Sequence, residues 1–285
     1  GLRQAFSAVE RFVNECWIAD RDRFSYEALN GTERLTQPML KQGGQWHEVD
    51  WQTALEYVAN GLKQIKADHG AQSIGTLVSP HSTLEELQLA TMLTRELGSD
   101  NIDYRLRNAE FAAFEGVRWL GTSIASLTQV QRALVVGSNL RKEHPLITSA
   151  SLMADRNAWA IDVAQSSIVE ADQWVEALAA VAAAIGETNG AAAPLAPKNA
   201  PDAAAKAIAA SLLSGERKAV LLGNAAAHHA QASSLLALAN WIGAQTGATV
   251  GYLTEAANTV GAQLVGAFPK NGGLDAGRML AAGTG

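Results

Sequence analysis

The stretch Arg132-Ala-Leu-Val-Val-Gly-Ser-Asn139 decides the fold class of this 285-residue chain. Its first five residues form an apolar run that predicts a strand, and its last three predict a tight turn. Leu221-Leu-Gly-Asn224 repeats the design, because it also joins an apolar strand to a turn before a helix. The repeated passage from strand to helix predicts an α/β fold with mainly parallel sheets.

The same alternation begins upstream, at Val49. Asp50 is the expected N-cap of a helix whose apolar residues recur at intervals of three and four, which places them on one face. These residues are Leu55, Val58, Leu62 and Ile65. A strand is expected over 73–79, and Ser82-Thr-Leu-Glu85 has the form of a capping box for a helix that ends at Leu97. A second strand is expected at 102–104, and 111–119 is expected to be short helix or irregular.

Downstream, the pattern predicts the same alternation of strands and helices. Strands are expected at 158–163, 219–222 and 248–253, and helices at 174–185, at 202–213 and from the Gly223-Asn224 turn to about Thr246. Residues 186–201 hold three prolines without periodicity, which is typical of a surface loop. We therefore expect an N-terminal entry segment (1–48), a first α/β lobe (49–186), a linker or surface loop (187–201) and a second lobe (202–285) truncated at its C-terminal end.

Composition excludes several classes of function. A formal net charge of -6 argues against nucleic acid as a partner, since phosphate backbones attract clustered Lys and Arg. Cys16 is the single cysteine, so an internal disulfide is impossible and a cytoplasmic setting is expected. No apolar stretch reaches the ~20 residues of a spanning helix, so no direct membrane insertion is expected.

The turns at Gly137 and Gly223 are the first candidate site. The carboxyl ends of parallel strands are where open α/β sheets bind ligands, and glycine lets a ligand approach the backbone. A turn that serves only the architecture would also favour glycine and asparagine, so both interpretations stay open. The chain has neither G-x-G-x-x-G nor G-x-x-x-x-G-K-[ST], its six histidines lack zinc-ligand spacing, and no G-x-S-x-G surrounds its serines.

Longer stretches carry a resemblance to a known family. Residues 13–24, 33–38 and 46–55 resemble, in order and spacing, the entry region of the molybdopterin oxidoreductases. Residues 78–86, 98–103 and 134–145 continue the match, which spans 13–269. Residues 221–229 and 252–261 are similar to the branch of this family found in bacterial NADH:quinone oxidoreductase, respiratory complex I. The resemblance implies the α/β fold of this family.

Two departures from the family pattern concern the metals. The resemblance places the fourth cysteine ligand of an iron–sulfur cluster at Ala19, where a methyl group cannot bind iron. It sets Asn101, Asp103 and Arg107 on the N-N-x-D…R element, which places the molybdenum ligand at Ala109. A one-residue shift would offer only Glu110, a weak substitute. Ala19 and Ala109 are thus lost ligand positions, and no metal is expected in this chain.

The pterin crevice is expected to be vestigial. In the family, strand-end turns hold the pterin, but here Leu140 replaces the proline of G-S-N-P. The residues expected to line the vestigial crevice are Ser79, Gly137, Ser138, Asn139, Arg141, Gly223 and Asn224. Neither catalytic residues nor a bound cofactor are expected.

The resemblance implies a role within a larger assembly. It implies a non-catalytic structural domain of the peripheral arm that passes electrons from NADH to quinone, in contact with other subunits on the cytoplasmic side of the inner membrane. The parent protein is expected to carry 2Fe-2S and 4Fe-4S clusters upstream. Two alternatives stay open: a molybdopterin-dependent oxidoreductase with unusual metal ligation, and a nucleotide or small-molecule binding module in the inherited crevice.

Overall fold

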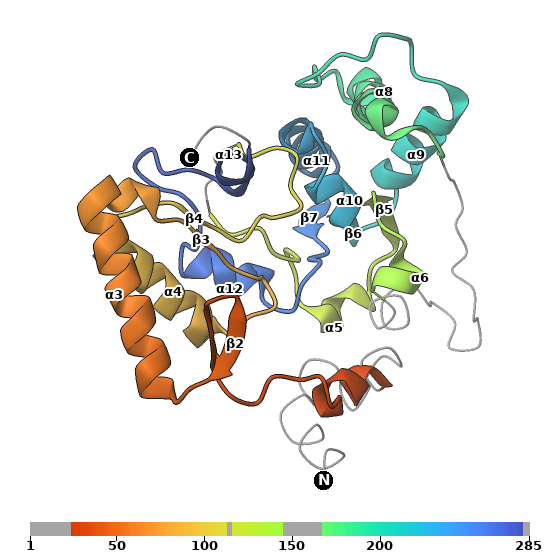
Figure 1. Cartoon of the computed structure of the whole chain (residues 1–285). Coiled ribbons are helices and arrows are strands. Elements are labelled where there is room, and N and C mark those ends of the chain that lie inside the picture. The colour runs from red at the N-terminus through yellow and green to blue at the C-terminus, as the bar shows by residue number, and fades with distance from the viewer. Residues whose placement is uncertain (1–23, 113–115, 145–166, 282–285) are drawn as a thin grey trace. The chain divides into compact units, whose positions relative to one another are not determined.

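The computed structural model describes residues 24–112, 116–144 and 167–281 (Figure 1). These residues fall into two compact units. Of the described residues, the sheet unit takes those within 107–260, and the return unit combines 24–106 with 261–281. Helix α12 (Thr259–Leu264) spans the boundary between them.

The sheet unit is built on three parallel strands in the order β5-β6-β7. Its elements are α5 (Ile124–Leu127), β5 (Arg132–Val136), α6 (Leu140–Glu143), η3 (Ala171–Gln173), α8 (Trp174–Asn189), α9 (Ala203–Leu213), β6 (Lys218–Leu222), α10 (Asn224–Ala227), α11 (Ala232–Thr246) and β7 (Thr249–Tyr252). Apolar side chains of α8, α9 and α11 pack with Val220, Leu222 and Tyr252 into the main core. Alternate strand residues, Ala219 and Leu221, form a smaller core with Leu140 and Leu253. The sheet is therefore buried on both faces, as parallel sheets generally are.

The return unit holds a parallel pair of strands and an antiparallel hairpin. Its elements are η1 (Ser25–Asn30), β1 (Met39–Gln42), β2 (Gln45–Glu48), α3 (Trp51–His69), η2 (Ala71–Ser73), β3 (Thr76–Leu77), α4 (Leu84–Glu96), β4 (Ile102–Asp103) and α13 (Ala276–Leu280). Its core joins Leu87, Ile102 and Tyr104 to Ala262 and Ala267, so residues far apart in sequence close it.

Most expected elements are present, with changes in their bounds. Asp50 caps α3 by accepting from the Thr53 N–H, as expected. The prediction of the capping box was wrong by one residue, because Thr83 and Glu86 form it and Ser82 and Glu85 do not. The expected strand over 73–79 is reduced to Thr76–Leu77, and the helix expected to run to Thr246 is split into α10 and α11. The strand expected at 158–163 lies outside the described residues.

The units divide the chain elsewhere than at the expected linker. Strand β5, before that linker, pairs along its length with β6, after it, so both belong to one sheet. Residues beyond 260 return to the unit that contains α3 and α4. The expectation of a truncated C-terminal end stays a prediction. Among the described residues, no helix is long and apolar enough to cross a membrane.

Candidate functional site at the carboxyl edge of the sheet

The carboxyl ends of β5, β6 and β7 lie at one edge of the sheet unit. Val136, Leu222 and Tyr252 are register partners on neighbouring parallel strands, so the segments after them start side by side. This edge is where an open α/β sheet binds ligands.

The two glycine turns at this edge pack against each other. The Ala225 N–H donates to the Gly137 carbonyl oxygen over 3.0 Å. Gly137 has a φ of 66°, and a Cβ added to it would lie 2.6 Å from the backbone nitrogen of Ala226. A Cβ added to Gly223 would overlap the Cβ of Ser138. The glycines therefore permit a close approach of one turn to the other, and the chain itself fills the space beside them.

The other residues expected in the crevice differ from one another in their contacts and in their exposure to solvent. Ser138 donates its hydroxyl to Glu143 over 2.8 Å. Asn139 and Arg141 are exposed. The Asn224 Oδ1 atom is buried without a hydrogen-bond partner among the described residues. Ser79 belongs to the return unit, where its hydroxyl accepts from the His81 N–H.

Residues 107–109 are held by contacts to the segments after β6 and β7. An Arg107 guanidinium nitrogen lies 3.0 Å from one Glu255 carboxylate oxygen, and His228 Nε2 lies 2.7 Å from the other. The Ala109 N–H donates to the His228 carbonyl oxygen over 3.3 Å. The Ala109 methyl group is exposed, and Glu255 is mostly buried. Glu255 is therefore shared between two basic side chains at the sheet edge.

Glu110 lies at the N-terminal end of α11. The Ser233 N–H donates to one Glu110 carboxylate oxygen over 2.8 Å, and the Ser233 hydroxyl donates to the other. A helix leaves its first N–H groups without partners inside the helix, and its N-terminus favours negative charge. The Glu110 carboxylate thus acts as a cap supplied from 123 residues away in sequence.

Tyr252 ends β7 beside this cap. Its side chain is 7% exposed, and its hydroxyl has no hydrogen-bond partner among the described residues. The Arg118 guanidinium lies 5.7 Å from the ring centre. Burial raises the pKa of the Tyr252 phenol, against the opposing charge of Arg118, and the charge of Glu110 adds to the rise. The phenol therefore stays protonated at neutral pH and can donate a hydrogen bond.

Asn101 and Asp103 have a structural role in the return unit. The Asn101 side chain accepts from the Leu274 N–H over 2.7 Å, and Asp103 accepts from the Ala276 N–H over 3.0 Å. Arg105 binds both Asp103 carboxylate oxygens at 2.9 Å, and Asp103 is fully buried. These bonds fasten the segment before α13 to β4.

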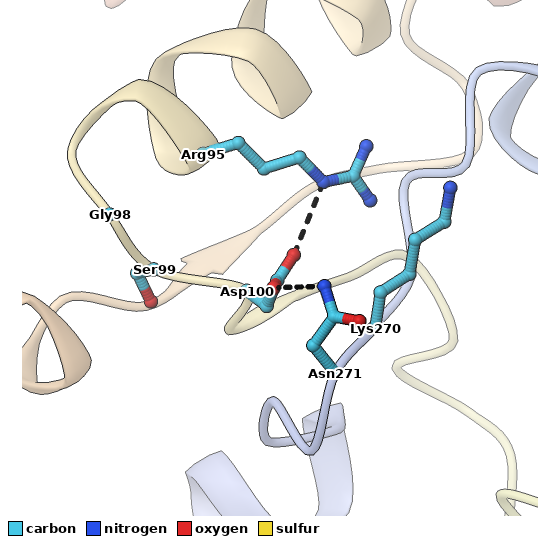
Figure 2. A pocket seen from close by; sticks show the side chains of 6 residues that line it. All are labelled: Arg95, Gly98, Ser99, Asp100, Lys270 and Asn271. Atoms are coloured by element: carbon cyan, nitrogen blue, oxygen red, sulfur yellow. Dashed lines mark hydrogen bonds and ion pairs between the residues drawn. The ribbon is translucent and has the colours of Figure 1, made fainter.

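A shallow depression of about 450 Å³ also lies in the return unit. Figure 2 shows Asp100 between Arg95 and Asn271, with bonds of 3.3 and 3.0 Å, and Lys270 beside them. Asp100 is the only carboxylate that lines this depression, and it is already paired with Arg95. We therefore interpret these side chains as a polar surface network and not as a catalytic site.

Sequence reasoning missed Glu255, His228 and Tyr252 as members of the sheet edge. Their positions just after strands or at a strand end were the available signal, since such positions meet at one edge. Ala19 lies outside the described residues. Within the described part of the chain, no three His, Cys, Asp or Glu side chains gather as a metal site would require.

The sequence pattern described as molybdopterin oxidoreductase matches residues 34–284, most of the chain. The chain belongs to the molybdopterin oxidoreductase family. A protein of Staphylococcus haemolyticus named "Putative formate dehydrogenase" is 31% identical over 151 residues, which are 50% of this chain and 15% of that protein. A protein of the same name from Staphylococcus aureus MRSA252 gives the same values. The matched part is thus a small fraction of these relatives' length.

Membership of the molybdopterin oxidoreductase family raises the question whether the sheet edge fits a metal-bound pterin. The resemblance assigns the metal ligand to position 109, where the side chain is a methyl group. The carboxylate of the next residue, Glu110, accepts a hydrogen bond from Ser233. The turns at Gly137 and Gly223 pack directly against each other. The described residues therefore do not fit a molybdenum that a protein side chain ligates at this position.

Proposed function

We propose that this chain is a non-catalytic structural domain of NADH:quinone oxidoreductase, within the molybdopterin-family subunit of its peripheral arm. The observation that supports this proposal most directly is the set of contacts made by residues 107–110. The position assigned to the metal ligand holds Ala109, while Arg107 is paired with Glu255 and Glu110 caps α11. The side chains around the lost ligand thus hold the segment in place, as a scaffold requires.

The assignment to the complex I branch rests on residues 221–229 and 252–261, which are similar to that branch. In the structure, these stretches begin at the carboxyl ends of β6 and β7 and contribute His228 and Glu255 to the sheet edge. Part of the branch resemblance therefore falls on the residues that close the edge. On this proposal the iron–sulfur clusters belong to other parts of the parent protein, and the domain contacts other subunits of the arm on the cytoplasmic side of the membrane.

Copurification tests the proposed assembly. The full protein, tagged in its own cells and purified without denaturation, is expected to copurify with NADH dehydrogenase subunits in near-equal amounts. The preparation is also expected to reduce quinone with NADH. A matched preparation of an unrelated tagged protein controls for carry-over. Purification of the protein without those subunits would contradict the assignment.

The second candidate is a molybdopterin-dependent oxidoreductase with unusual metal ligation. It is favoured by the relatives, which are named as formate dehydrogenases and are 31% identical over the matched stretch. Formate-dependent dye reduction by the same purified protein distinguishes the two candidates. We expect none, and turnover with formate would support the second candidate.

A further inference from the structure

Helix α3 of the return unit, the long orange helix of Figure 1, carries an apolar stripe that the described part of the chain leaves open. Five apolar residues recur on it at intervals of four, three, four and three, which places them on one face. They are Trp51, Leu55, Val58, Leu62 and Ile65. No residue of α3 is buried, and the exposed fractions of Trp51, Leu55 and Val58 are 68%, 62% and 53%.

A helix with such a stripe is normally held by what packs on it. A helix alone is only marginally stable in water, so most of its stability in a protein comes from burial of its apolar face. Single exposed apolar residues are common, but a contiguous row of large ones marks an interaction surface. No residue of α3 belongs to the core that Leu87 and Ile102 form in the same unit. We therefore interpret the stripe as an interaction surface.

The spacing of the stripe indicates the kind of partner that fits it. Alternating intervals of three and four are those with which two helices pack side by side at a shallow angle. The positions beside the stripe are small, namely Ala54, Ala59 and Gly61. A Cβ added to Gly61 would meet nothing within 4 Å, so a second backbone can approach closely there. The stripe thus fits an amphipathic helix.

The small parallel sheet of the return unit points to where such a helix comes from. Strands β3 and β4 contribute two residues each and pair only with each other among the described residues. A pair of strands is marginal by itself, and parallel sheets are normally extended and covered on both faces. Parallel strands are joined by crossovers that usually contain a helix. A stretch of chain that added a strand to this pair would therefore also bring a helix to the return unit.

A longer parent protein has the length to supply that stretch. The 151 residues matched in the Staphylococcus haemolyticus protein are 15% of it, so most of that relative lies outside the match. We propose that the stripe of α3 is the docking surface of an amphipathic helix of the parent polypeptide that lies outside these 285 residues. The proposal goes beyond the proposed function, because a structural domain and an active oxidoreductase would use this surface in the same way.

Hydroxyl-radical footprinting of the full parent protein, purified from its own cells, tests whether the stripe is covered. Trp51 lies on the stripe, whereas Tyr57 lies on another face of α3 with 56% of its side chain exposed. A packed helix leaves little of Trp51 exposed, so we expect its oxidation to be at least about fivefold slower than in the urea-unfolded protein. Tyr57, the matched control, is expected to be less protected. Protection of Trp51 no greater than that of Tyr57 would overturn the proposal.

Photo-cross-linking in the same full protein identifies the occupant. A photoreactive phenylalanine analogue replaces Leu55, and mass spectrometry locates the residue that it captures. We expect capture of a residue of the same polypeptide outside 1–285. The analogue at Tyr57 is the control and is expected to give much less of this product. Capture of a second copy, of another subunit or of a residue within 1–285 would overturn the assigned occupant.

Two charged variants give a test that needs no labelling. Leu55→Glu would place an unpaired carboxylate beneath the docked helix, whereas Tyr57→Glu places one on another face of α3. We expect L55E to lower the Tm of the full protein by at least about 2 °C more than Y57E does. Equal Tm values for the two variants would contradict a covered stripe. The copurified subunits are measured separately, so a failure here leaves the proposed function standing.

Discussion

At the scale of single residues, the segment that holds Ala109 is fixed by internal contacts, since Arg107 pairs with Glu255 and Glu110 binds Ser233. The sequence alone, aligned with the family pattern, is enough to assign the metal-ligand position to Ala109. The partners of Arg107 and Glu110 could not be predicted, because Glu255 and Ser233 lie more than a hundred residues away in sequence. Spacing along a chain identifies residues on one element, but it does not tell which carboxylate reaches which donor.

Tyr252 gives a prediction of pH dependence. The folded state raises the pKa of its phenol above the ordinary 10.0, so the fold favours the neutral form. The resulting stability is present below pH 10.0 and is lost as the pH rises through the folded pKa. We expect Tyr252→Phe to reduce the loss of unfolding free energy between about pH 8 and about pH 11, measured by chemical denaturation.

The control for this prediction is Tyr57→Phe. Tyr57 lies on α3 with 56% of its side chain exposed. Its substitution should leave the alkaline loss of stability as in the wild type. An alkaline loss in Y252F as steep as that of the wild type would show that another group causes it.

At the scale of elements, the sequence predicts which helices and strands exist better than it predicts where they end or which of their faces are buried. The spacing of Leu55, Val58 and Ile65 identified α3, but more than 40% of each of these side chains is exposed. Periodicity places residues on one face of a helix and does not tell whether a neighbour covers that face. The S-x-x-E pattern found the start of α4, yet the adjacent T-x-x-E fits the same rule and is the one that forms.

The register of this capping box can be tested by two neighbouring glutamates. Glu86→Ala removes the bond to the Thr83 N–H, so we expect a loss of about 0.5–1 kcal/mol in unfolding free energy. Glu85→Ala removes an acidic residue from the same helical turn without breaking the box and should cost less. A larger effect for E85A would move the box back to Ser82.

The packing of the two glycine turns predicts a larger effect for one glycine than for another. Gly137→Ala meets the backbone nitrogen of Ala226 in addition to its φ of 66°, whereas Gly190→Ala has a φ of 70° and open space around it. We expect about 1 kcal/mol of destabilisation for G190A and at least about 2 kcal/mol for G137A, from thermal unfolding. Equal effects would mean that the turns do not pack closely.

At the scale of the whole chain, the sequence predicted the α/β class, and the family match supports it. It did not predict that residues after 260 return to the unit of α3 and α4. Asp103 is the clearest sign of that return, since it binds Arg105 nearby and the Ala276 N–H far along the chain. Long-range returns of this kind leave no local pattern, because they depend on which buried partners meet in the fold.

Asp103→Asn tests the return. It leaves Arg105 buried beside an uncharged partner, so we expect a loss of about 3 kcal/mol or more in unfolding free energy. Asp100→Asn, at an ion pair with Arg95 in which the two side chains are 23% and 29% exposed, should cost no more than about 1 kcal/mol. A similar loss of unfolding free energy in the two variants would contradict the role of Asp103 in holding the returning segment.

The metal content of the full protein, purified from its own cells, tests the central claim most directly. Molybdenum and tungsten are measured by mass spectrometry of the elements, with a formate-oxidising member of the family purified in parallel as the positive control. The account predicts far less than one atom of either metal per chain in this protein and a near-stoichiometric amount in the control. Stoichiometric molybdenum or tungsten in this protein would contradict it.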